Sequence, residues 1–187
     1  MSMALVQRED KTRIDELSAA VAARRFRGVT YFVPPGLEWV EEDSPAGAVH
    51  VADMGVSLRF DDLRFNVAWS MNGFNEGLAV ATDPVDPLFF GRSAVAVDAS
   101  AIPPWPSRLG HAVEGISWAW HQPGDDCPEL LWAVRFDFGV TGSAVIALGE
   151  VDDGKPRYMP DSLLVLFDEN LARSYVIPAG ESSSWGA

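Results

Sequence analysis

The stretch VSLRFDDLRFNVAW, residues 56–69, predicts a β-hairpin, because apolar and polar side chains alternate in both of its halves. The two aspartates at its centre supply the turn. A register in which Phe60 faces Leu63 places the apolar side chains on one face and the polar ones on the other, namely Ser57, Arg59, Arg64 and Asn66. We therefore expect an antiparallel sheet with one packed face and one solvated face.

Further apolar runs on either side of this hairpin predict more strands. The expected segments are residues 29–33, 48–52, 78–82, 94–97, 111–121, 129–138, 142–149, 162–167 and 171–177. The unbroken apolar run 163–167 predicts a strand that is buried on both sides. Residues 101–110 contain three prolines around Trp105, and they predict an ordered loop.

One segment, residues 12–25, has apolar side chains at helical spacing. Thr12 is its expected N-cap, and Gly28 is expected to end the helix. The helix and the strands together predict an α+β fold that is predominantly antiparallel β. In this fold the amphipathic helix packs on a twisted antiparallel sheet of about nine or ten strands.

Length and composition indicate one globular domain. The chain has 187 residues, of which 48% are hydrophobic and 22% charged. We expect a single domain over residues 1–187, with flexible ends at residues 1–11 and 179–187. The single cysteine, Cys127, excludes an intrachain disulfide and favours a reducing compartment, so the predicted location is cytoplasmic.

The charge is strongly negative and unevenly distributed. Lys and Arg number 14 and Asp and Glu number 27, which gives a formal net charge of −13. Residues 1–27 hold 6 of the bases and 4 of the acids, so residues 28–187 keep 8 bases and 23 acids, a balance of −15. Such a body repels nucleic acid and anionic membranes and attracts a basic protein. No apolar run approaches the roughly 20 residues of a membrane-spanning helix.

Motifs that carry known chemistry are missing from the sequence. There is no G-x-G-x-x-G, Walker A, H-E-x-x-H, C-x-x-C or G-x-S-x-G pattern, so no cofactor and no catalytic residue is predicted. Residues 121–127, HQPGDDC, bring a histidine, two carboxylates and a thiol together, and a solvated hairpin loop is the favoured interpretation over a Cys–His nucleophile pair. The histidines lie in separate segments, so no metal site is predicted.

These observations favour a non-enzymatic interaction protein of the inhibitor, immunity or adaptor kind, whose acidic surface docks on a basic partner protein. A simpler interpretation is that the surplus carboxylates only keep the protein in solution. The expected partner-binding residues lie in two loops, and they are Glu38, Glu41, Glu42, Asp43, Asp83 and Asp86.

The alternative is a domain that binds a small ligand or carbohydrate, or hydrolyses one, with a Trp-lined pocket and one or two carboxylates. The residues of such a pocket would be Trp105, Glu114, Trp118, Trp120 and Asp137. The competing interpretation is that these tryptophans belong to the core. A structural subunit of a homo-oligomer is a third possibility, and the sequence does not fix the oligomeric state.

Overall fold

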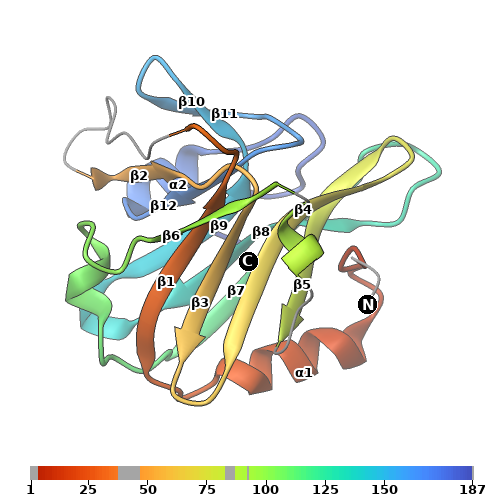
Figure 1. Cartoon of the computed structure of the whole chain (residues 1–187). Coiled ribbons are helices and arrows are strands. Elements are labelled where there is room, and N and C mark those ends of the chain that lie inside the picture. The colour runs from red at the N-terminus through yellow and green to blue at the C-terminus, as the bar shows by residue number, and fades with distance from the viewer. Residues whose placement is uncertain (1–3, 38–46, 83–86, 92, 187) are drawn as a thin grey trace.

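Two five-stranded antiparallel sheets face each other and enclose most of the core (Figure 1). The computed structural model describes residues 4–37, 47–82, 87–91 and 93–186. A separate two-stranded hairpin, β10 (Glu150–Asp152) with β11 (Lys155–Arg157), projects from one end of this sandwich.

The first sheet has the order β5-β4-β3-β1-β6. Its strands are β1 (Phe26–Val33), β3 (Gly55–Phe60), β4 (Arg64–Asn72), β5 (Asn75–Thr82) and β6 (Val95–Asp98). The β3–β4 hairpin has the predicted register, since Val56 pairs with Val67 and the Phe60 N–H donates to the Leu63 carbonyl at 2.8 Å. Local alternation was therefore sufficient to align these two strands.

The second sheet has the order β2-β12-β9-β8-β7. Its strands are β2 (Val49–Val51), β7 (Gly115–His121), β8 (Leu130–Asp137), β9 (Ser143–Leu148) and β12 (Leu163–Leu166). All four residues of β12 are buried, as the unbroken apolar run predicted. A register shift between Ala119 and Trp120 interrupts the regular alternation of the β7–β8 pair.

Aromatic rings join the two sheets across the core. The Phe136 ring on β8 lies 6.4 Å from the Phe60 ring and 5.1 Å from the Phe65 ring, measured between centroids. The chain before the first helix closes one edge, because the Val6 N–H donates to Leu78 of β5 and the Val6 carbonyl accepts from Leu131 of β8. The interior is thus an apolar layer between sheets, bridged by backbone hydrogen bonds at that edge.

The N-terminal helix, α1, spans Lys11–Val21 and is shorter than predicted. Asp10 caps it, with the Asp10 carboxylate accepting from the Arg13 N–H at 3.1 Å, so Thr12 is not the N-cap. Ala22 is the C-cap of the helix, and Gly28, the predicted stop, lies within β1. Among the described residues, no helix combines the length and apolarity required to span a membrane.

A second helix, α2 (Glu169–Ser174), replaces most of the strand predicted for residues 171–177. The Asp168 carboxylate accepts from the Leu171 N–H at 2.7 Å, and Arg173 pairs with Glu169 one turn away. These two interactions stabilise a short helix although the apolar spacing alone resembles a strand. The described residues also contain the short 3-10 helices η2 (Pro87–Phe90), η3 (Trp105–Arg108) and η4 (Gly139–Thr141).

The predicted fold class is confirmed in its coarse form, since the chain is mostly antiparallel β with an N-terminal helix. The described residues form 12 strands in three sheets, rather than one sheet covered by that helix. Helix α1 buries only Leu17 and Val21 and runs across one end of the sandwich (Figure 1). The second sheet, and not the helix, packs on the apolar face of the first sheet. Two extended apolar faces bury more surface against each other than one short helix can.

The outer face of the first sheet is only partly solvated, which corrects the hairpin prediction. Arg59 and Arg64 are exposed, but Ser57 and Asn66 are buried and share a side-chain hydrogen bond of 2.7 Å. Aromatic rings cover this region, with Phe32 and Phe90 stacked at 3.6 Å between centroids. The 3-10 helix η2 therefore adds a small second core outside the sandwich.

The last residues make specific contacts with the rest of the chain. The Ser184 N–H donates to the Tyr175 carbonyl at 2.8 Å, and the Trp185 ring lies under Arg135 at 4.1 Å and Arg173 at 4.5 Å. The predicted flexibility of residues 1–11 and 179–187 concerns their motion, and it remains a prediction. These contacts would slow amide hydrogen exchange around Ser184 relative to a free tail.

Candidate functional site

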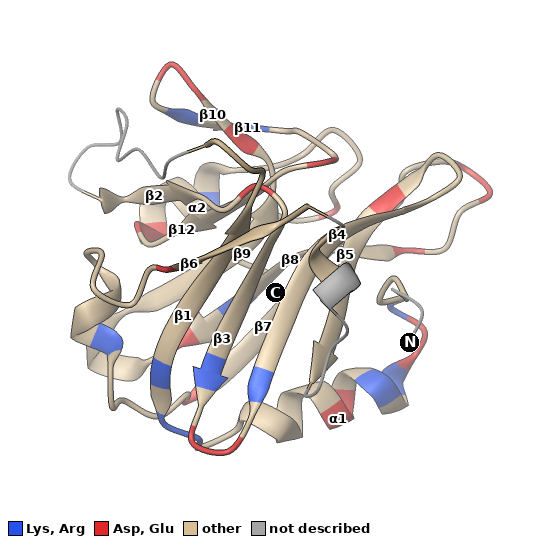
Figure 2. Cartoon of the chain, viewed as in Figure 1, with Lys and Arg blue, Asp and Glu red and all other residues tan. Residues whose placement is uncertain are grey.

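Three connections bring carboxylates to one end of the sandwich, at the β4–β5 turn, the β7–β8 loop and the β10–β11 hairpin (Figure 2). Side-chain contacts hold these connections together. The Cys127 thiol donates to the Asn75 amide oxygen at 2.7 Å, and the Tyr158 hydroxyl donates to the Glu76 carboxylate. We call the following set the acidic end: Glu76, Asp125, Asp126, Glu129, Glu150, Asp152, Asp153, Asp161 and Glu181.

Few basic residues neutralise the acidic end. Arg8 pairs with Glu129 and with Glu181, at 2.6 Å each, and Arg157 pairs with Asp152 at 3.0 Å. In the described part of the chain, no ion pair is made by four exposed aspartates of the acidic end, Asp125, Asp126, Asp153 and Asp161. These four carboxylates therefore give the acidic end a local negative potential.

At the opposite end of the first sheet, arginines stand beside the carboxylates. Asp61 and Asp62, at the β3–β4 turn, pair with Arg27 and Arg24 respectively. The hydrogen bond from Arg27 is the main reason that the pKa of the Asp61 carboxyl lies below its usual value. Ion pairing thus neutralises carboxylates at one end and leaves several unpaired at the other.

The six residues predicted to bind a partner, Glu38, Glu41, Glu42, Asp43, Asp83 and Asp86, lie outside the described residues. The acidic end is a different group of carboxylates. Sequence reasoning treated Asp125 and Asp126 only as solvated residues of a turn. Their placement at the same end of the sandwich as Glu76 and Asp153 depends on sheet topology, which a local pattern does not reveal.

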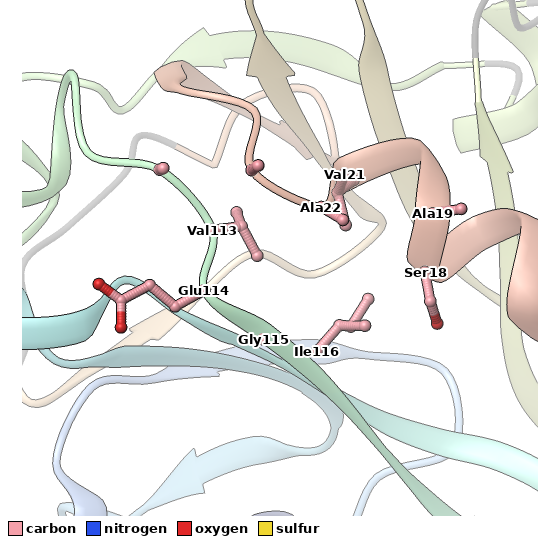
Figure 3. Close-up of a pocket in the computed structure, with 10 residues that line it drawn as sticks. Ser18, Ala19, Val21, Ala22, Val113, Glu114, Gly115 and Ile116 are labelled. Carbon is pink, nitrogen blue, oxygen red and sulfur yellow. The ribbon is translucent and has the colours of Figure 1, made fainter.

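A pocket of about 660 Å³ lies between the last turn of α1 and the start of β7 (Figure 3). We call it the helix pocket. Small apolar groups dominate its lining, which consists of Ser18, Ala19, Val21, Ala22, Ala23, Ala112, Val113, Glu114, Gly115 and Ile116. The Glu114 carboxylate points away from α1 and lies beside Gly139. The pocket therefore suits an apolar group more than a charged one.

The residues predicted to form a Trp-lined pocket are not assembled around the helix pocket. Of the five, only Glu114 lines it. Trp118 is half-buried and donates to the hydroxyl of Ser18, a lining residue, at 3.3 Å. Trp120 is also half-buried, and the Asp137 carboxylate accepts from the Gly139 N–H at 2.9 Å.

Trp105 is fully buried and belongs to the core. Its indole N–H donates to the Tyr31 hydroxyl at 2.6 Å, that hydroxyl donates to His50 Nδ1 at 2.9 Å, and His50 Nε2 donates to the Pro103 carbonyl at 2.8 Å. Burial lowers the pKa of His50 to about 4. This chain of hydrogen bonds requires a neutral imidazole, because Nδ1 acts as an acceptor.

Arg108 is buried next to this chain. It donates to the Pro104 and Ser143 carbonyls at 2.9 Å each, and its guanidinium lies 5.0 Å from the Phe167 ring centroid. Burial lowers the pKa of Arg108 to about 10. These contacts fasten η3 to β9, so the role that the geometry supports is structural.

His121 and Cys127 do not use each other as hydrogen-bond partners. His121 is buried and its Nε2 donates to the Glu76 carbonyl at 2.8 Å, whereas the Cys127 thiol donates to Asn75. Burial lowers the pKa of His121, which favours the neutral ring. Both side chains hold the β4–β5 turn against the β7–β8 loop, as the predicted hairpin-loop interpretation allows.

Comparison with protein-family models, with curated proteins and with solved structures finds no match to the chain. In the part of the chain that the structure describes, no three His, Cys, Asp or Glu side chains meet in an arrangement that holds a metal ion. Function is therefore inferred from the geometry and charge of this chain.

Proposed function

We propose that the chain is a non-enzymatic interaction protein of the inhibitor, immunity or adaptor kind, and that its acidic end docks on a basic partner protein. The observation that supports this most is that the β7–β8 loop and the β10–β11 hairpin, which carry the unpaired carboxylates Asp125, Asp126 and Asp153, lie at the same end of the sandwich. Unpaired charge of one sign speeds association with a partner of the other sign. The single Cys127 favours a partner in the same reducing, cytoplasmic compartment.

Solubility alone would not require this distribution. Carboxylates spread evenly over the surface would keep the protein dispersed equally well. On α1, the exposed acids Asp15 and Glu16 stand close in sequence to Lys11 and Arg13, which reduces the local potential. Docking and solubility therefore predict different consequences of removing charge from the two regions.

Two triple variants with the same net charge separate these explanations. The first is Asp125→Asn, Asp126→Asn and Asp153→Asn, and the second is Glu9→Gln, Asp15→Asn and Glu16→Gln. The probe is a synthetic peptide of alternating Gly and Lys, titrated at low salt. We expect the first variant to bind about tenfold more weakly than the native chain and the second to change by less than about threefold.

Equal losses in the two variants would show that only net charge matters, and the docking proposal would then be abandoned. A second check is salt dependence. Binding to the native chain is expected to vanish as salt approaches about 1 M, because screening shortens the reach of each charge.

A second candidate function is binding of a small apolar molecule in the helix pocket, favoured by its volume of about 660 Å³ and its alanine-rich lining. The variant Ala19→Trp would fill the pocket, and Ala101→Trp adds the same ring at an exposed site elsewhere. We expect the neutral dye N-phenylnaphthylamine to fluoresce with the native chain and with Ala101→Trp, and to lose its signal with Ala19→Trp. Unchanged fluorescence in Ala19→Trp would remove this candidate.

A further inference from the structure

One large apolar side chain stands almost completely in solvent beside the acidic end. Phe74, in the β4–β5 turn, is 95% exposed, and Met71 on the same hairpin is 48% exposed. Burying a Phe side chain is worth about 1.5–3 kcal/mol, so its exposure at a protruding turn leaves a large contact energy unused.

The turn itself does not need a phenylalanine. Asn72 pairs with Asn75, which leaves Gly73 and Phe74 as the two central residues of a tight hairpin. Gly73 has φ +66°, a left-handed conformation that glycine adopts without strain. Phe74 follows it and makes no contact that the fold requires, so this position accepts a smaller residue without loss of stability.

Side-chain contacts anchor the hairpin to neighbouring segments despite its exposure. Three contacts hold the residues that follow Phe74: the Cys127 thiol to Asn75, the His121 imidazole to the Glu76 carbonyl, and the Tyr158 hydroxyl to the Glu76 carboxylate. Burial raises the pKa of Tyr158, so its hydroxyl remains protonated and able to donate. A rigid element loses little conformational entropy when it binds, which favours affinity.

We propose that Phe74 is the apolar anchor of the acidic end, inserting into a hydrophobic socket on a protein partner whose rim carries Lys or Arg. This inference rests on the proposed docking function and adds the point of contact and the chemistry of the partner's surface. Asp125 and Asp126 lie in the loop that contacts the hairpin through Cys127, so unpaired carboxylates belong to the segment adjoining the hairpin that carries Phe74. Aromatic anchors surrounded by polar groups dominate the energy of many interfaces.

A protein fits these features better than a membrane does. Anionic lipid surfaces repel the carboxylates of the acidic end, and a neutral bilayer offers them no opposite charge. A basic protein supplies both an apolar socket and cations around it.

The test compares two synthetic peptides of equal length and charge, one of Leu and Lys and one of Gly and Lys, against the native chain, Phe74→Ala and Val140→Ala. Val140 is 99% exposed in η4 and serves as a matched apolar control. We expect the native chain to bind the Leu–Lys peptide about tenfold more tightly than the Gly–Lys peptide. Phe74→Ala should remove this difference in affinity without weakening the binding of the Gly–Lys peptide. Val140→Ala should retain the difference.

The possible failures point to different causes. If neither peptide binds the native chain, the docking function itself is wrong. If both bind and Phe74→Ala still prefers the Leu–Lys peptide tenfold, docking stands and the anchor is wrong. Binding of neutral phosphatidylcholine vesicles by the native chain, lost in Phe74→Ala, would overturn the choice of a protein partner.

Discussion

Replacing Trp105 with alanine is expected to lower the free energy of unfolding by about 4 kcal/mol. The ring is fully buried, at 5.2 Å from the Phe26 ring and 4.9 Å from the Phe167 ring, and the substitution leaves a cavity between them. It also removes the donor that begins the hydrogen-bond chain through Tyr31. The measurement is the midpoint of urea unfolding, read with the same slope for both proteins.

Two further variants check the origin of this loss. Val140→Ala truncates an exposed side chain and should leave the midpoint unchanged. Trp105→Phe keeps an aromatic ring at this position, so its free energy of unfolding should fall less than that of the alanine variant. A Trp105→Ala protein as stable as the native chain would show that this ring is not part of the core, and the ligand-pocket interpretation of Trp105 would regain support.

Acidification is expected to destabilise the protein through His50. An exposed histidine in the unfolded chain has a pKa of about 6.5, and burial lowers the pKa of His50 in the folded chain to about 4. Between these values the unfolded state binds one more proton than the folded state, so stability falls as pH decreases from 6.5 to 4. The full loss from this residue is roughly 3 kcal/mol, and it is complete below the folded pKa.

Urea unfolding at a series of pH values measures this effect, with His50→Gln and His111→Gln as the variants. Glutamine at position 50 retains hydrogen-bonding groups but does not titrate, so the dependence of stability on pH between 6.5 and 4 should become shallower, with the buried His121 supplying a remaining part. His111 is exposed, and its substitution should preserve the native dependence. A His50→Gln protein with the native pH profile would contradict the buried, neutral imidazole described here.

The sequence predicted the local part of the fold because hairpin pairing follows from alternation within a short stretch. The β3–β4 register and the burial of β12 are examples. The division into two sheets depends on pairings between distant segments, such as β1 with β6 and β2 with β12. No local pattern distinguishes these pairings from those of one large sheet.

Helix α2 was not predicted, because the apolar residues in this segment fit the spacing of a strand as well as that of a helix. Leu171, Tyr175 and Ile177 are spaced as a strand requires, and the helix is only 6 residues long. The signal that was available is Asp168 followed by Leu171, an N-cap pattern with Glu169 in the first turn. Whether a short helix forms depends more on its N-cap than on the spacing of its apolar residues.

The candidate site also depends on contacts between distant segments, which a local sequence pattern does not reveal. Composition established that carboxylates exceed basic residues, but the sequence does not say which carboxylates Arg24 and Arg27 neutralise. The exposure of Phe74 did have a sequence signal, a bulky apolar residue directly after Asn72-Gly73 in a turn. Its place beside Asp125 and Asp126 follows only from the contact between Cys127 and Asn75.

An NMR titration of the isotope-labelled chain with the Leu–Lys peptide tests the docking claim most directly, because each backbone amide reports separately. The largest chemical-shift changes are expected in residues 71–76 and 122–129, which form the hairpin turn and the loop against it. Changes concentrated on α1, or spread evenly over all acidic regions, would contradict a docking surface at the acidic end.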